Sequence, residues 1–131
     1  MSVDIRELAA IFGGGMAGAL ARVGLGDLFP SGPTAWPWAI FAINLAGAFL
    51  LGWLITRLQE RLPISTYPRP LAGTGFCGAF TTFSTLQLQL LTMLEHHCDG
   101  LAAGYAVASL VGGYSAVGAA SALARRARVL R

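Results

Sequence analysis

Hydrophobic residues in this chain fall into four long runs separated by short polar turns. The runs cover about residues 8–28, 38–56, 70–94 and 101–124. A helix needs about 20 residues to cross a bilayer, so each run is long enough. The first turn, 29–37, contains three prolines and one glycine, a composition typical of turns. The pattern predicts an all-α fold in which residues 1–131 form a single integral membrane domain with four transmembrane helices.

The third run has an unusual centre. Residues 73–85 are rich in glycine, hydroxyl groups and phenylalanine, although the run contains no charge. Glycine and a Thr-Thr pair weaken helix propensity at this point. At membrane depth, an opened backbone is tolerated only where protein buries it or where it lines a hydrated cavity. We therefore expect a break near residues 78–82, with carbonyls and hydroxyls directed at a polar species.

The first run carries a stripe of small residues that ends in a charge. Gly14, Gly18 and Arg22 are spaced four apart and share one helix face. The two glycines form a small-xxx-small packing pattern. Arg22 either extends its charge to the membrane interface or has a structural or vestibule role inside the protein.

Isolated polar residues mark the second and fourth runs. Asn44 is the only strongly polar side chain between residues 38 and 56. It either bonds a neighbouring helix or contacts a substrate. Tyr105 and Ser109 share a face of the fourth run. Ser109 either faces this polar side or bonds back to its own helix.

Composition and charge support a membrane protein and indicate its orientation. The chain is 55% hydrophobic and 11% charged, whereas soluble proteins are about 25% charged. The first and third turns carry no Arg or Lys. The opposite side carries eight arginines, at positions 6, 57, 61, 69, 125, 126, 128 and 131. The positive-inside rule places both termini in the cytoplasm and predicts insertion in a single orientation. The clustered charge does not indicate nucleic-acid binding.

The chemistry of the runs favours ion passage over catalysis. The sequence contains no nucleotide-binding loop, Ser-His-Asp set or metal-ligand cluster, so we expect no enzyme activity. A cation path normally carries carboxylates, whereas neutral donors without a buried carboxylate favour a small anion. The electropositive ring edge of Phe83 suits the same role. Backbone oxygens at the break suit a hard cation such as Na⁺.

On these residues, the chain resembles the Fluc (CrcB) family of fluoride channels over nearly its whole length. The resemblance rests on Ala21-Arg22, Asn44-Leu45-Ala46-Gly47, the segment 75–85 and the segment 104–109. It implies an antiparallel dual-topology-type dimer in the cell (inner) membrane, with two narrow pores for passive export of cytoplasmic fluoride. It also implies a structural, non-transported Na⁺ held by the carbonyls of Gly78 and Thr81. The implied fluoride pore contains Asn44, Phe83, Ser84, Thr85, Tyr105 and Ser109, with Arg22 in a structural or vestibule position.

Two residues depart from the family pattern. Leu86 stands where the family usually has a second pore phenylalanine, and Gln89 stands where it often has glutamate. The first departure and the one-sided arginines favour a heterodimer with an oppositely oriented homologue over a homodimer. Two alternatives stay open. One is a non-conducting or regulatory subunit of a heteromeric channel. The other is a small multidrug exporter, but such exporters need a carboxylate in the first helix, and residues 8–26 contain none.

Overall fold

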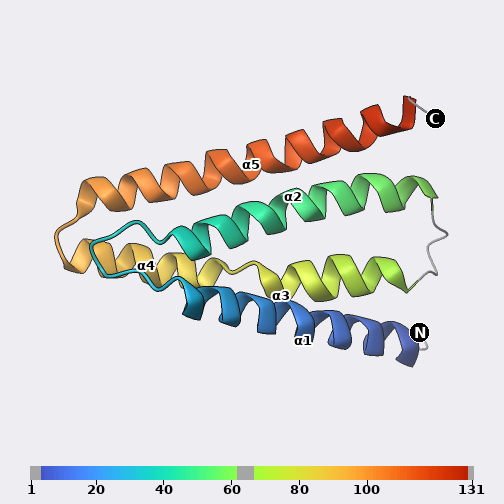
Figure 1. The fold of residues 1–131 in the computed structure, drawn as a ribbon, viewed down its shortest axis with the longest axis horizontal. Coiled ribbons are helices and arrows are strands. Elements are labelled where there is room, and N and C mark those ends of the chain that lie inside the picture. Colours follow the sequence, from blue (N-terminus) through green and yellow to red (C-terminus); the bar gives the residue numbers. More distant parts are fainter. Residues whose placement is uncertain (1–3, 62–66, 130–131) are drawn as a thin grey trace.

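The computed structural model describes residues 4–61 and 67–129, and within them it is all-helical. Figure 1 shows the helices running side by side along the long axis of the molecule. The elements in chain order are α1 (Ile5–Leu28), α2 (Trp38–Arg61), η1 (Pro70–Cys77), α3 (Gly78–Phe80), α4 (Phe83–Glu95) and α5 (Asp99–Val129). η1 is a π-helix and the others are α-helices. The all-helical part of the predicted fold class is therefore confirmed.

Three helices among the described residues are long and apolar enough to cross a membrane, namely α1, α2 and α5. They contain the first, second and fourth hydrophobic runs, but they extend further because the polar residues at their ends are also helical. The third run is divided among η1, α3 and α4, which have 8, 3 and 13 residues. None of these is long enough alone. α3 and α4 follow one another end to end (Figure 1), with α3 packed against α1 and α4 packed mainly against α5. Membrane crossing by this divided segment stays a prediction.

Close backbone contact joins α1 to the divided segment. α1 packs along η1 and α3, whereas α2 packs mainly along α5. Gly14 and Gly18 are both buried in α1. A Cβ at Gly14 would collide with the carbonyl oxygen of Leu71, and one at Gly18 with that of Phe76. The predicted glycine stripe is therefore a packing surface, because only residues without a side chain allow this approach.

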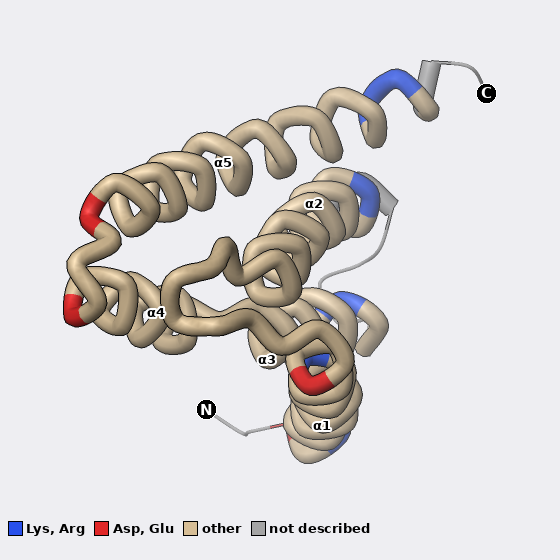
Figure 2. Tube along the Cα trace, turned by 60° about the vertical axis from the view of Figure 1, so that its left-hand side comes forward, with Lys and Arg blue, Asp and Glu red and all other residues tan. Residues whose placement is uncertain are grey.

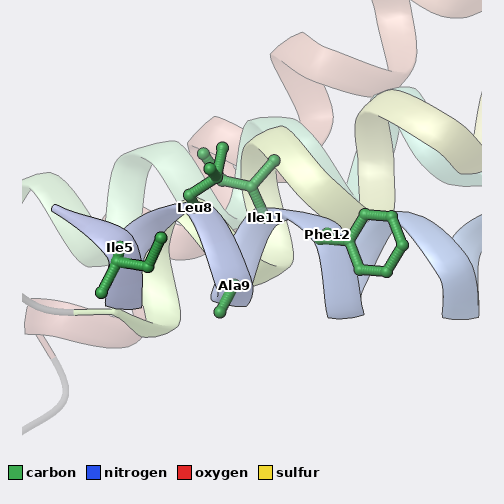
Figure 3. A pocket seen from close by; sticks show the side chains of 5 residues that line it. All are labelled: Ile5, Leu8, Ala9, Ile11 and Phe12. Carbon is green, nitrogen blue, oxygen red and sulfur yellow. The ribbon is translucent and has the colours of Figure 1, made fainter. Parts of the chain in front are cut away.

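Much of the apolar surface of the single chain is uncovered. Phe12 is 69% exposed, Leu20 72% and Leu110 73%. Apolar surface on this scale requires lipid or another subunit to cover it. A shallow hollow near the start of α1 (Figure 3) belongs to this surface, and its lining is Ile5, Leu8, Ala9, Ile11 and Phe12. It offers no hydrogen-bonding side chain to an ion.

Charged residues gather at the two ends of the molecule. Figure 2 shows basic residues at the ends of α2 and α5, and acidic residues at the turn between α4 and α5. The starts of α1 and η1 lie at the same end as the basic residues (Figure 1). Arg57 lies over the ring of Trp53, 5.3 Å from its centroid. Arg131 and the side chains of Arg61 and Arg128 lie outside the described residues.

Candidate functional site

The helical backbone opens at two threonines in the third segment. α3 ends at Phe80 and α4 begins at Phe83, and the intervening Thr81 and Thr82 have extended backbone. Thr82 is the N-cap of α4, because its hydroxyl accepts a hydrogen bond from the Thr85 N–H at 3.2 Å. The N–H and hydroxyl of Thr81 both donate to the Cys77 carbonyl, at 3.1 and 3.0 Å. Local side chains therefore stabilise this opening.

Asn44 on α2 both donates a hydrogen bond to the opened backbone and accepts one from it. Its Nδ2 donates to the Thr82 carbonyl at 3.0 Å, and its Oδ1 accepts from the Thr82 N–H at 2.8 Å. The sequence left open whether Asn44 holds another segment or contacts a substrate. The structure shows that it holds another segment. Since Nδ2 has two hydrogens, one of them is not used in this pair.

In an uninterrupted helix, the carbonyls of Gly78 and Thr81 would accept hydrogen bonds from two N–H groups that bind other partners here. In an α-helix, the N–H of residue i+4 donates to the carbonyl of residue i. The regular donor for Gly78 is the Thr82 N–H, which donates to Asn44 instead. The regular donor for Thr81 is the Thr85 N–H, which donates to the Thr82 hydroxyl. Carbonyl oxygens of this kind are ligands that hard cations prefer, so the residues fit the implied Na⁺ site.

A cluster of hydroxyls follows the opening. The Thr82 hydroxyl donates to Thr85 Oγ1 at 3.0 Å and lies 3.3 Å from Ser84 Oγ. Thr82 is only 7% exposed. Ser84 and Thr85 were predicted pore residues, whereas Thr82 was expected at the break but was not assigned to the pore. The available signal was a threonine directly before an apolar helical run, which is a common N-cap pattern.

A hollow on α2 and α4, here called the break hollow, gathers several of the predicted residues. Its lining consists of Asn44, Gly47, Ala48, Leu51, Thr81, Thr82, Phe83, Leu86 and Val117. Phe83 is 70% exposed in the single chain. Gly47 is buried here, and a Cβ on it would collide with the side-chain methyl of Thr81. The absence of a side chain at Gly47 therefore lets α2 lie against the opening.

A second hollow, here called the turn hollow, lies where the turn before α2 meets α4. Its lining consists of Ser31, Gly32, Pro33, Ala35, Pro37, Thr85, Leu88, Gln89, Thr92 and Met93. The bond between Thr82 and Thr85 connects the two hollows, because Thr82 lines one and Thr85 lines the other. The lining residues of both hollows carry no charged side chain.

Tyr105 lies behind the turn hollow and is fully buried. Its ring packs edge-on against Trp36, with 5.4 Å between centroids. Its hydroxyl donates to Gln89 Oε1 at 2.8 Å. Gln89 stands out in the sequence as a polar side chain in an apolar run and as a departure from the family, but its contact with Tyr105 was not predicted.

The remaining candidates, Ser109 and Arg22, are not among the residues that line either hollow. Ser109 Oγ is buried and has no hydrogen-bond partner among the described residues, so it does not bond back to its own helix. Arg22 is half-buried, and its Nε is likewise buried without a partner in the described part of the chain. The structure therefore brings Asn44, Phe83 and Thr85 together through Thr82, and leaves Ser109 and Arg22 apart from them.

Comparison with known proteins identifies the family of this chain. The model of the family described as "CrcB-like protein, Camphor Resistance (CrcB)" matches residues 9–121. A fluoride-specific ion channel FluC 1 of Mycolicibacterium paratuberculosis is 58% identical over 128 residues, covering 98% of this chain and 97% of that protein. A FluC 1 of Mycobacterium bovis is 54% identical with the same coverage. A FluC 3 of Streptomyces avermitilis is 40% identical over 124 residues, covering 95% of this chain and 61% of that protein. Because these matches extend over nearly the whole chain, the chain belongs to the CrcB family.

Proposed function

We propose that this chain is a subunit of a fluoride-specific channel that lets fluoride leave the cytoplasm passively and so reduces fluoride toxicity. The names of its relatives support this proposal. The observation that carries it is the paired contact between Asn44 and Thr82 beside Phe83 in the break hollow. This contact puts a neutral hydrogen-bond donor beside the ring of Phe83, at an opening in the proposed membrane segment.

Neutral donors in a narrow path suit a small anion. Fluoride is strongly hydrated, so closely placed donors must replace its water shell. The amide of Asn44 and the edge of Phe83 contribute in the break hollow, and the hydroxyl of Thr85 contributes in the turn hollow. The uncharged lining of both hollows avoids repulsion of the anion.

The opened backbone suits a resident cation as well as a mobile anion. The carbonyls of Gly78 and Thr81 would hold a structural Na⁺, because their regular helical donors bind elsewhere. When bound, this ion supplies a fixed positive charge between the subunits and is not transported.

A second, oppositely oriented subunit completes the channel in this proposal. Phe83 is largely exposed in the single chain, so the break hollow is open to a partner. One-sided arginines favour insertion in one orientation, with both termini cytoplasmic and the subunit in the cell (inner) membrane. Leu86 gives the break hollow a residue without an electropositive ring edge. Both features favour a heterodimer with an oppositely oriented homologue.

Fluoride efflux from liposomes tests the proposal. Vesicles are loaded with fluoride and contain either this chain alone or the chain co-expressed with a homologue of opposite arginine bias. A fluoride electrode then records efflux, with chloride-loaded vesicles as the selectivity control. We expect fluoride-selective efflux from the pair. Absence of fluoride efflux from every combination contradicts the channel function, and equal efflux from the chain alone contradicts the heterodimer.

Leu86 also favours a second candidate function, a regulatory subunit whose partner carries the working pore. The two functions differ in what Asn44 does. In the channel proposal, substitution of Asn44 in the assembled pair lowers fluoride efflux. Efflux that stays unchanged in this variant, with the pair still assembled, supports the regulatory function.

A further inference from the structure

The hydroxyls of Thr82, Ser84 and Thr85 differ in whether they can still donate a hydrogen bond. A hydroxyl has one hydrogen. Thr82 gives its hydrogen to Thr85 Oγ1, so its contact with Ser84 uses the Ser84 hydrogen. Thr85 Oγ1 accepts in this arrangement, and its own hydrogen has no acceptor among the described residues. Thr85 can therefore donate into the turn hollow, whereas Ser84 has used its hydrogen on Thr82, and Thr82 has used its hydrogen on Thr85.

Gln89 also keeps free donors, because of its bond with Tyr105. Tyr105 gives its single hydrogen to Gln89 Oε1. This bond turns the Gln89 oxygen toward Tyr105 and leaves Nε2, with two hydrogens, directed away from it. Gln89 lines the turn hollow and lies four residues after Thr85, so the two side chains share a helix face. Since Tyr105 is fully buried, it acts on the hollow only through Gln89.

Asn44 completes the set. One Nδ2 hydrogen and the Oδ1 atom bind the Thr82 backbone, and the second Nδ2 hydrogen remains. The side chain lines the break hollow. Free donors are thus present in both hollows, on either side of the bond from Thr82 to Thr85.

We propose that the anion path of this chain consists of three free donors, on Asn44, Thr85 and Gln89, and that Tyr105 and Thr82 are positioning residues that orient them. This inference rests on the proposed channel function and refines it. Gln89 becomes a specificity-determining residue, because an amide held by its oxygen offers only donors to the hollow. A path lined in this way favours small anions that accept several hydrogen bonds.

Valine substitutions test the role of Thr85, because valine keeps the shape of threonine and removes the hydroxyl. In liposomes containing the conducting assembly, we expect Thr85→Val to lower fluoride efflux about tenfold or more, the loss of one hydrogen bond to an anion. Thr85→Ser restores the hydroxyl and should recover most of the efflux. Thr56→Val is the matched control, because Thr56 bonds back to the Gly52 carbonyl at 2.8 Å and lines neither hollow. Equal efflux in Thr85→Val and Thr56→Val overturns the assignment.

A second comparison stays within the turn hollow. Thr92 lines this hollow on the same helix, but its hydroxyl already donates to the Leu88 carbonyl at 2.9 Å. Thr92→Val should therefore lower efflux less than Thr85→Val. A loss of the same size in both variants would mean that any hydroxyl in the hollow matters, and that hydrogen-bond direction does not.

A double-mutant cycle tests the positioning role of Tyr105. We expect Gln89→Met to lower fluoride efflux about tenfold, since methionine keeps the length of glutamine without its donors. Tyr105→Phe should lower efflux in the wild-type background and have no added effect in Gln89→Met, because both variants remove the same oriented amide. Equal effects of Tyr105→Phe in the two backgrounds contradict the inference.

Fluoride efflux by the wild-type assembly distinguishes failure of the proposed function from failure of the donor assignment. If it does not conduct fluoride, the proposed function fails and this inference fails with it. If it conducts and Thr85→Val and Gln89→Met behave like Thr56→Val, only the donor assignment fails. Size-exclusion profiles identify variants that do not assemble. If Thr85→Val does not assemble, the donor assignment is tested by the double-mutant cycle of Gln89→Met and Tyr105→Phe, with Thr85→Ser as the variant that keeps the hydroxyl.

Discussion

Substitution of Asn44 by alanine should weaken the protein more than its small change in size suggests. The variant removes at once the acceptor of the Thr82 N–H and the donor to the Thr82 carbonyl, which lie at 2.8 and 3.0 Å. Thr82 is 7% exposed, so solvent does not readily replace either partner. Each buried polar group left without a partner costs about 1–3 kcal/mol, so the two together cost about 2–6 kcal/mol.

Unfolding of the purified protein in mixed detergent micelles, followed by tryptophan fluorescence, measures this cost. Thr56→Val is the matched control on the same helix, since Thr56 donates only to a carbonyl that also belongs to the helical ladder of α2. We expect the control to change the free energy of unfolding by less than about 1 kcal/mol.

Hydrogen exchange provides an independent check at the bond itself. The Thr82 amide should exchange at least about tenfold faster in Asn44→Ala, because its protection depends on the local free energy of opening. If Asn44→Ala unfolds with the same free energy as Thr56→Val and the Thr82 amide keeps its protection, the bonds of Asn44 do not stabilise the opening.

Three further predictions use other parts of the structure. Gly18→Ala should lower the free energy of unfolding by about 1–3 kcal/mol, because its Cβ would collide with the Phe76 carbonyl. Gly24→Ala has open space around its Cβ and should raise the free energy of unfolding by up to about 1 kcal/mol, and the reverse order of the two variants in the same assay would contradict this prediction. Replacing Na⁺ with a large organic cation should lower fluoride efflux, because no cation present is then small enough to bind the carbonyls at the opening. Equal efflux in both buffers argues against the cation site. Leu86→Phe should raise fluoride efflux through the conducting assembly by adding a ring edge to the break hollow, and an unchanged or lower efflux at the electrode argues against that role.

The helices were predictable because hydrophobic length alone sets the minimum extent of a membrane helix. Their ends were not, since α2 continues to Arg61 and α5 to Val129 through residues that are polar but favourable in helices. The π-helical form of Pro70–Cys77 was also not predicted. No propensity rule distinguishes a π-helix from an α-helix over so short a segment, and here the form accompanies close packing against α1.

The individual polar residues of the site were also predictable, but their partners were not. Asn44 stands out in an apolar run, yet its contact with Thr82 joins residues 38 positions apart. Such a contact depends on how closely α2 approaches the opening, and Gly47 permits that approach. Gln89 stands out as a polar side chain in an apolar run and as a family departure, but its contact with Tyr105 depends on the packing of α4 against α5.

The bond between Asn44 and Thr82 links the proposed cation site to the proposed anion path. It engages the Thr82 N–H, which would be the regular helical donor of the Gly78 carbonyl, and this carbonyl belongs to the proposed cation site. It also orients the amide of Asn44, a side chain that lines the break hollow. Under both assignments, Asn44→Ala lowers fluoride efflux and also changes its dependence on Na⁺, because the segment between the Gly78 carbonyl and Thr85 then loses the bonds that fix it to α2. A variant that loses efflux but keeps the wild-type Na⁺ dependence would show that the two sites are independent.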